Sequence, residues 1–162
     1  MDVLIKTMKF ITNLISSVII IVGTIFVILF AVGIQPFVVE SGSMEPTIKT
    51  GSLCFINKRM PYEDIKKDDI IAFKIPSGSY VTHRVVEINN KGLITKGDAN
   101  GNVDNVITTP ETYLGKNFFS IPKCGILVKK TQTTSGKIIV ATFILVLFIA
   151  GILLGESSKR NK

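Results

Sequence analysis

The sequence predicts a mainly β fold: a compact, antiparallel, partly closed β-barrel flanked by an N-terminal and a C-terminal transmembrane helix. Three observations support this prediction. Hydrophobic residues make up 46% of the 162 residues, a high share for a soluble domain of this size, and they concentrate at the two ends. The central part shows several short β-prone runs separated by Gly, Pro and Asn turns. It shows no convincing amphipathic helix, which favours an antiparallel β domain.

The first apolar run, residues 10–34, contains no charged residue. Its most apolar part, Leu14 to Ile34, is 21 residues long. As a helix it would measure about 32 Å, enough to cross a hydrocarbon core of roughly 30 Å. A cleaved signal peptide is the alternative, because Lys6 and Lys9 could form its basic start and residues 31–33 resemble a cleavage site. The apolar core of a signal peptide is typically about 7–15 residues, so the longer run favours an uncleaved anchor.

The second apolar run, residues 137–155, has 18 uncharged residues after Lys137, near the lower limit for a membrane span. Basic residues flank both runs on the side of the termini: Lys6, Lys9, Lys159, Arg160 and Lys162. Because basic flanks stay in the cytoplasm, we expect residues 1–9 and the basic tail 156–162 there. Residues 35–136 would then lie on the extracytoplasmic face of the cell membrane, between two spans.

The net charge of +7 has a topological explanation, since at least five of the cations flank the two predicted spans. The other basic residues are scattered and form no stripe with interleaved aromatic residues, so nucleic-acid binding is not expected. Cys54 and Cys124 both fall in the predicted exported segment, where a disulfide is permitted but not required. Either cysteine could equally be a buried core residue.

The central segment contains seven short runs that are expected to form strands. In chain order they are residues 37–39, 52–57, 69–75, 80–88, 93–96, 113–119 and 125–128. The third and fourth runs form a hairpin around the turn Pro76-Ser77-Gly78. In the fourth run, alternation places Val81, His83 and Val85 on one face of the strand and Thr82, Arg84 and Val86 on the other.

A turn-rich stretch, residues 41–47, follows the first apolar run closely and contains Ser43. Nine residue steps separate Ile34 from Ser43, which span at most about 30 Å when extended. Ser43 is therefore held close to the membrane. We interpret it as a candidate nucleophile, although a serine hydroxyl needs a nearby base to take its proton. A serine in such a stretch is also a common turn former.

His83 is the single histidine of the chain and the natural candidate for that base. Asp98 and Asp104 follow it in a polar loop, and a carboxylate bound to the far imidazole nitrogen would orient the ring. Both aspartates could instead be Asx-turn residues. Residues 97–104 also resemble a calcium loop, but the terminal glutamate is missing at the required spacing. No metal or cofactor is expected.

Three motifs taken together resemble the ordered motif boxes of type I signal peptidases. They are Ser41-Gly42-Ser43-Met44-Glu45-Pro46-Thr47, Thr82-His83-Arg84-Val85-Val86, and Lys96-Gly97-Asp98-Ala99-Asn100 followed by Asp104. The resemblance covers roughly residues 10–130. The histidine of the second box stands where the common bacterial enzymes have a lysine. This is the pattern of the endoplasmic-reticulum and archaeal type, which some Gram-positive bacteria also carry.

The resemblance implies a role for each matching residue. Ser43 would be the nucleophile and His83 its general base. Asp104 would orient His83 and Asp98 would be a supporting carboxylate in the same loop, although the two aspartates could exchange these roles. The hydroxyl of Ser41 would join the backbone N–H of Ser43 in an oxyanion hole.

The function implied is a membrane-bound serine endopeptidase that removes N-terminal signal peptides from exported preproteins at small-x-small sites. Its partners would be preprotein signal peptides and the lipid bilayer, while a need for accessory membrane subunits stays open. The alternative is a catalytically idle, membrane-tethered β domain that binds partners or assembles a surface structure. A self-cleaving regulator would need a DNA-binding segment, for which this sequence shows no pattern.

Overall fold

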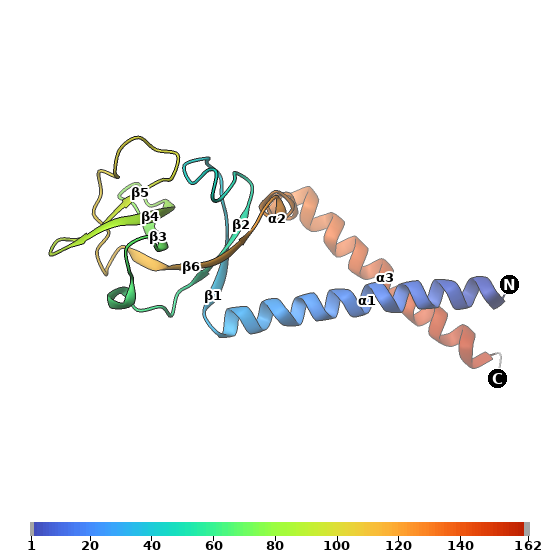
Figure 1. The fold of residues 1–162 in the computed structure, drawn as a ribbon. Coiled ribbons are helices and arrows are strands. Elements are labelled where there is room, and N and C mark those ends of the chain that lie inside the picture. The colour runs from blue at the N-terminus through green and yellow to red at the C-terminus, as the bar shows by residue number, and fades with distance from the viewer. Residues whose placement is uncertain (1, 161–162) are drawn as a thin grey trace. The chain divides into compact units, whose positions relative to one another are not determined.

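The computed structural model describes residues 2–160, and it describes side chains for residues 3–150. The chain consists of two compact units. Residues 29–129 form a β unit that contains every strand, and the described parts of residues 1–28 and 130–162 form a helical unit (Figure 1). The β unit carries all the residues that the sequence singled out for chemistry.

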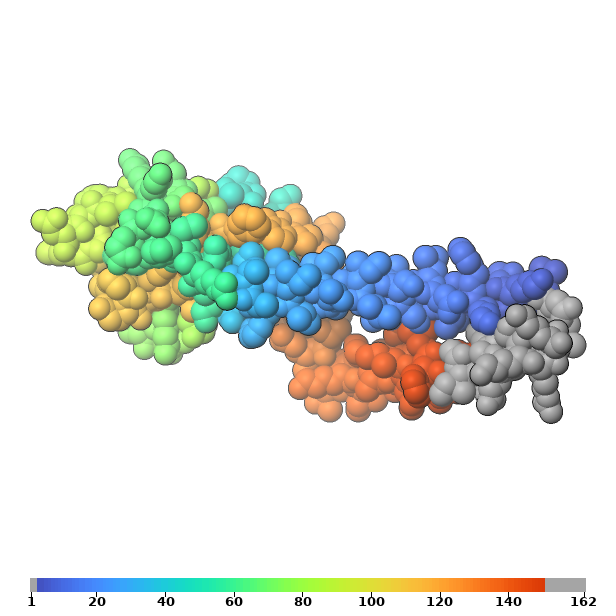
Figure 2. Space-filling model, turned by 90° about the horizontal axis from the view of Figure 1, so that it is seen from below, coloured from blue at the N-terminus to red at the C-terminus, as the bar shows by residue number. Residues whose placement is uncertain are grey.

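Three α-helices are found among the described residues. They are α1 (Asp2–Ala31), α2 (Cys124–Gln132) and α3 (Thr134–Arg160). Within the described residues, α1 is long and apolar enough to cross a membrane by itself, whereas α2 and α3 meet that test only together, as a pair sharply bent at Thr133. Most of the large apolar side chains of α1 are exposed. Figure 2 shows this helix in blue. The predicted second span, residues 137–155, falls within α3, and its side chains from residue 151 onward lie outside the described residues.

Six strands form one antiparallel sheet in the order β1-β2-β6-β3-β4-β5. They are β1 (Ile34–Val38), β2 (Leu53–Asn57), β3 (Ile70–Lys74), β4 (Tyr80–Asn89), β5 (Gly92–Lys96) and β6 (Tyr113–Ile121). A short 3₁₀ helix, η1 (Tyr62–Asp64), connects β2 to β3. The prediction of a mainly β, antiparallel domain is thereby confirmed.

The predicted partial closure into a barrel is wrong, because the sheet is open. Among the described residues, β2 is the only strand that pairs with β1, and β4 is the only strand that pairs with β5, which has one further isolated bridge from Leu93 to Thr108. β1 and β5 therefore form the two edges of the sheet. Register shifts between β2 and β6, β3 and β6, and β4 and β5 mark bulges, which bend a sheet. A groove separates β1 from the beginning of β4, so no ladder of backbone hydrogen bonds joins them.

The seventh predicted strand, residues 125–128, is also wrong, since this segment belongs to α2. A short apolar run fits a strand or a helix equally well by periodicity. Packing decides the conformation here: β6 ends at Ile121, and Lys123 adopts a positive φ of 65° that turns the chain. Gly125 then lies so close to the main chain just before β2 that an added Cβ would collide with the carbonyl oxygen of Ser52. Both cysteines are free thiols, and burial raises the pKa of Cys54 to about 11.

Two clusters of buried side chains form the core of the β unit. One contains Met44, Ile48, Cys54, Ile56 and Ala72, and the other contains Ile65, Ile71, Phe73, Val85 and Leu93. The first cluster includes two side chains from the turn that carries Ser43. The second cluster includes neighbours of His83 on β3 and β4. The core therefore fixes both segments on which the candidate chemistry depends.

We expect Ile71→Ala to lower the free energy of unfolding by about 2–5 kcal/mol, because Ile71 is fully buried and the substitution leaves a cavity. The same substitution at Ile88, which is 49% exposed, should change it by less than about 0.5 kcal/mol. Tyrosine fluorescence during urea unfolding reports the β unit, since the chain has no tryptophan and its three tyrosines all lie there. Equal losses in the two variants would contradict this assignment of the core.

Candidate active site

Ser43 lies in a turn whose apolar residues Met44 and Ile48 are packed in the core of the β unit. After β1 the chain bends through residues 41–50 and returns as β2. Within this turn Met44 and Ile48 are each only 2% exposed, and the N–H of Ile48 donates to the carbonyl oxygen of Met44 at 2.8 Å. With these two side chains in the core, residues 45–47 between them are exposed. Ser43 directly precedes the buried Met44 and is itself half-buried.

His83 projects from the buried face of β4 toward this turn. The predicted alternation along the strand is confirmed, since His83 and Val85 are buried and Ile71 of β3 lies opposite His83. The imidazole is packed edge-on against the ring of Phe73, with the ring centroids 6.2 Å apart. Its Nε2 atom lies 2.9 Å from the Oγ atom of Ser43. Two residues that are 40 positions apart in the chain are thereby in direct hydrogen-bond contact.

The structure brings Asp104, rather than Asp98, to the imidazole. The Oδ2 atom of Asp104 lies 2.7 Å from Nδ1 of His83. Asp98 instead accepts two hydrogen bonds from Arg84, one from Nε at 2.8 Å and one from Nη2 at 2.7 Å. Because Arg84 follows His83 directly on a strand, it points to the opposite face. The two carboxylates of this loop are therefore divided between the two faces of β4.

The two hydrogen bonds of His83 fit a neutral imidazole that can act as a base. When the N–H of the neutral ring is at Nδ1, it donates to the carboxylate of Asp104, and Nε2 then has a free lone pair. The hydroxyl of Ser43 can donate to that lone pair at the observed 2.9 Å. Such a geometry allows His83 to remove the hydroxyl proton while Asp104 stabilises the imidazolium that forms.

The polar loop that carries both aspartates is packed directly on the Ser43 turn. The N–H of Ala99 donates to the carbonyl oxygen of Ser43 at 2.9 Å. A Cβ atom at Gly97 would lie 2.5 Å from the same oxygen, so only glycine permits this close approach. The third predicted box is thus in contact with the first, and the contact fixes the main chain of the nucleophile candidate.

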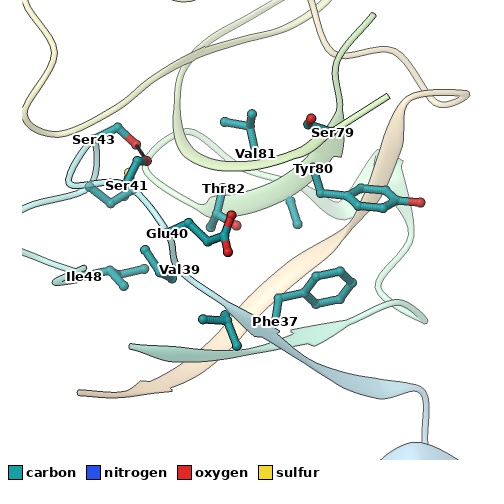
Figure 3. A pocket seen from close by; sticks show the side chains of 13 residues that line it. Phe37, Val39, Glu40, Ser41, Ser43, Ile48, Ser79, Tyr80, Val81 and Thr82 are labelled. Carbon is teal, nitrogen blue, oxygen red and sulfur yellow. Dashed lines mark hydrogen bonds between the residues drawn. The ribbon is translucent and has the colours of Figure 1, made fainter. Parts of the chain in front are cut away.

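Ser41, the remaining predicted site residue, lies beside Ser43. The Oγ atoms of the two serines are 3.2 Å apart, and the side chain of Ser41 is exposed. Figure 3 shows the two hydroxyls together at one end of a groove. The structure therefore gathers Ser41, Ser43, His83 and Asp104 into one site and places Asp98 behind it.

The groove runs from these serines toward the aromatic rings of Phe37 and Tyr80, whose centroids are 5.8 Å apart. It has a volume of about 310 Å³. Its walls come from the end of β1 with the following turn, from the beginning of β4, and from β3. The lining residues are Phe37, Val38, Val39, Glu40, Ser41, Ser43, Met44, Ile48, Ala72, Ser79, Tyr80, Val81 and Thr82. The groove is therefore mostly apolar and leads directly to Ser43.

Sequence reasoning assigned no role to three polar residues at or near the site: Arg84, Thr95 and Glu40. Arg84 had a usable signal, since it follows His83 on a strand and so must face away from it toward the other carboxylate. Thr95 lies on the buried face of β5 and contacts Asp104, which only the folded loop reveals. Glu40 lines the groove and pairs with Lys129 of α2 at 2.7 Å, a contact across 89 residues that no local pattern indicates.

Two of these contacts, Arg84 with Asp98 and Lys129 with Glu40, lower the pKa of the carboxyl group involved. The hydrogen bonds from the Arg84 guanidinium hold the pKa of Asp98 below its ordinary value of 3.8, against the opposing effect of partial burial. The same pair raises the pKa of Arg84. The ammonium group of Lys129 lowers the pKa of Glu40. Asp98 therefore stays ionised and bound to Arg84 throughout the neutral range.

Comparison with known proteins agrees with the resemblance seen in the motifs. A family model described as "Signal peptidase, peptidase S26" matches residues 11–100, more than half of the chain. The chain is similar to signal peptidase I W of Bacillus subtilis, with 38% identity over 77 residues that cover 45% of this chain and 40% of that protein. It is also similar to the signal peptidase complex catalytic subunit sec11 of Schizosaccharomyces pombe, with 33% identity over 96 residues, covering 46% of this chain and 50% of that protein. The chain therefore spans half or less of the length of these curated relatives.

We expect Asp98→Asn to lower the free energy of unfolding by about 1–2 kcal/mol at pH 7, because the substitution removes hydrogen bonds to a charged group. A carboxyl whose pKa is depressed on folding contributes stability above its unfolded value, near 3.8, and loses it as the pH falls through the lower folded value. The difference between wild type and variant should therefore shrink below about pH 4. Urea unfolding from pH 7 to pH 3 measures it, with the exposed Asp64→Asn as control. A difference independent of pH would contradict the role of the charge.

We expect Gly97→Ala to destabilise the β unit by about 1–3 kcal/mol, since the new methyl group would collide with the carbonyl oxygen of Ser43. Gly101 provides the matched control in the same loop, because a Cβ atom there would meet nothing within 4 Å. Gly101→Ala should change the stability by less than about 0.5 kcal/mol. If both variants unfold at the urea concentration of the wild type, the loop does not press on the Ser43 turn as described.

Proposed function

Because the chain belongs to the signal peptidase family, peptidase S26, we propose that it is a membrane-bound serine endopeptidase that removes N-terminal signal peptides from exported preproteins. The observation that carries the proposal is the continuous hydrogen-bonded series from the hydroxyl of Ser43 through the imidazole of His83 to the carboxylate of Asp104, with distances of 2.9 and 2.7 Å. An idle partner-binding domain would have no need for this alignment.

The reaction begins when Nε2 of His83 accepts the proton of the Ser43 hydroxyl as Oγ attacks the scissile carbonyl carbon. Asp104 keeps its hydrogen bond to Nδ1 and stabilises the imidazolium. The imidazolium then gives its proton to the leaving nitrogen, which becomes the new N-terminus of the mature protein. The signal peptide remains as an ester on Ser43. A water molecule gives a proton to His83 as its oxygen attacks the ester carbon. The bond from that carbon to Oγ then breaks, and His83 returns the proton to Oγ. This step regenerates Ser43 and releases the peptide with a free carboxylate.

The negative charge that develops on the carbonyl oxygen needs hydrogen-bond donors fixed in advance. We assign this role to the backbone N–H of Ser43 and the hydroxyl of Ser41, whose Oγ lies 3.2 Å from that of Ser43. Removing one such donor typically lowers the rate by about 10²–10³. Asp98 acts indirectly in this scheme, through the loop that it ties to Arg84.

The groove suggests how a preprotein would bind. In the part of the chain that the structure describes, β1 pairs on one side only, with β2. There, the first residues of β4, Tyr80 to Thr82, pair with β3 alone, because the ladder to β5 begins at Arg84. Two strand edges therefore border the groove near Ser43. An extended substrate could form hydrogen bonds with an edge as an added strand, and its alternate side chains would point into the protein. Shallow apolar pockets there would select small residues, such as Ala, at the first and third positions before the cut.

The anchor would bring the active site to its substrate. Within the β unit, the carbonyl oxygen of Ala31, the last residue of α1, accepts a hydrogen bond from Nη2 of Arg59 at 2.6 Å. Ser43 then lies within about 40 Å of chain from that helix end, at ~3.3 Å per residue. Signal peptides emerge from the same membrane, so the tether raises their effective concentration at the site. In this proposal both termini are cytoplasmic, a second span lies within residues 137–155, and residues 35–136 are extracytoplasmic.

The proposal is tested by cleavage of a model preprotein with an Ala-x-Ala site by purified, detergent-solubilised protein. We expect S43A and H83A each to lose at least about 10³-fold in kcat, since either change interrupts proton transfer to the nucleophile. D104A should lose much more activity than D98A, because only Asp104 contacts the imidazole. H83K tests whether a lysine can replace the histidine as base.

Tyrosine fluorescence and circular dichroism establish that each variant is folded. Cleavage by folded S43A would overturn the assignment of the nucleophile. Equal losses in D104A and D98A would overturn the distinction between the two aspartates. If the wild type cleaves neither this preprotein nor a preprotein from its own cell, the idle β domain becomes the better description of the protein.

A further inference from the structure

Thr95 occupies a position on β5 where an apolar side chain would be expected. It pairs with Val85 of β4 and is fully buried, with a relative exposure of 0%. Leu93, two residues earlier on the same face of β5, is 2% exposed and belongs to the second core cluster together with Val85. A hydroxyl group buried in such surroundings is costly unless it forms a hydrogen bond. Its partner therefore shows what the hydroxyl does.

That partner is the carboxylate of Asp104. The Oγ1 atom of Thr95 donates to Oδ2 of Asp104 at 2.5 Å, and the same oxygen accepts the Nδ1–H of His83 at 2.7 Å. The main chains of the two residues are joined as well, since the N–H of Asp104 donates to the carbonyl oxygen of Thr95 at 2.8 Å. Thr95 thus holds Asp104 by both its backbone and its carboxylate.

Such a hold is needed because Asp104 itself lies outside any strand or helix. It follows a stretch, residues 97–103, that is rich in glycine and asparagine and contains no regular secondary structure. A carboxylate with the imidazole as its one partner could rotate toward solvent, since 17% of the Asp104 side chain is exposed. The hydroxyl of Thr95, on the buried strand β5, is a second donor to this carboxylate. It restricts the rotation of the Asp104 side chain, because Oδ2 must then face both His83 and Thr95.

We infer that Thr95 is a positioning residue whose hydroxyl fixes the carboxylate of Asp104 in the orientation that holds His83. The inference deepens the proposed function and rests on it for its effect on cleavage. The register explains why these residues meet: His83 and Val85 share the buried face of β4, and Thr95 lies opposite Val85. Among the described residues, Thr95 does not line the groove and forms no hydrogen bond with the hydroxyl of Ser43, whereas it does bind Asp104. Its effect on cleavage would therefore pass through Asp104.

Thr108 provides a matched control within the same unit. It is also fully buried, and it forms an isolated β-bridge with Leu93, two residues from Thr95. In the part of the chain that the structure describes, its Oγ1 atom has no hydrogen-bond partner. Thr→Val at either position therefore replaces a buried hydroxyl with a methyl group of similar size, but only at Thr95 does it remove a contact with the proposed active site.

The test measures kcat and KM for the model preprotein with wild type, T95V, T95S and T108V. We expect T95V to lower kcat by about tenfold or more with little change in KM, because misplacing a group that orients the base affects the chemical step. T95S keeps the hydroxyl and should stay within about threefold of the wild type. T108V should retain wild-type kcat. T95A, which removes the hydroxyl without adding a methyl group, is measured beside T95V in case valine does not fit.

A second readout does not depend on cleavage. The chain has a single histidine, so protein labelled with ¹⁵N- and ¹³C-histidine gives one set of imidazole resonances, all from His83. In the wild type we expect the proton to be held at Nδ1, with a strongly downfield Nδ1–H signal. In T95V and T95A this signal should weaken and the other tautomer should appear, while T95S and T108V should keep the wild-type pattern.

The two readouts separate the possible failures. If T95V and T95A leave both kcat and the imidazole resonances unchanged, or if T108V lowers kcat as much as they do, Thr95 is only a satisfied core hydroxyl and the inference is overturned. If kcat falls but the resonances of His83 do not change, the action through Asp104 is overturned. If the wild type does not cleave but T95V still shifts the tautomer, the positioning role stands and the proposed function fails.

Discussion

The hydrogen bond between Nδ1 of His83 and the carboxylate of Asp104 is the contact on which the rest of the site depends. It joins the buried face of a central strand to an irregular loop, and it is formed where little water can compete with it. Once the ring is fixed from this side, its other nitrogen can point in only one direction, toward the hydroxyl of Ser43. The turn that carries Ser43 is held next to the imidazole by two contacts. Its side chains Met44 and Ile48 are packed in the core, and Ala99 of the neighbouring loop donates a hydrogen bond to the carbonyl oxygen of Ser43.

The two faces of β4 carry residues with different roles, one in the candidate chemistry and one in the stability of the loop. His83 faces the core and the nucleophile, whereas Arg84 faces the other way and binds Asp98 and the carbonyl oxygen of Asp68. The ion pair between Arg84 and Asp98 stabilises the loop from outside the site. The carboxylate of Asp104 is therefore left to bind the imidazole of His83. The adjacent residues His83 and Arg84 of β4 thereby bind the same loop at two points, Asp104 and Asp98.

The open sheet has a functional consequence of its own. A ladder of backbone hydrogen bonds between β1 and the beginning of β4 would fill the space that the groove now occupies. Keeping that ladder unformed leaves strand edges and apolar walls beside Ser43, where an extended chain could take the missing position. The exposed edge is short, since β1 has five residues and its neighbour β2 covers its other side. In the proposed function, the gap in the sheet is therefore the substrate site.

The sequence alone determined the features that follow from local periodicity and length. The length of the apolar run at residues 10–34 and the alternation that buries His83 were readable without a structure. The family was indicated by the resemblance of the three ordered boxes to those of type I signal peptidases, and the match to the family model confirms it. Tertiary structure decided the openness of the sheet, the helical conformation of residues 125–128, the side of β4 on which each aspartate lies, and the contact of Thr95 with Asp104. Alternation along a strand is fixed by the backbone itself, whereas the position of a loop carboxylate depends on which buried partner can reach it after the chain has folded.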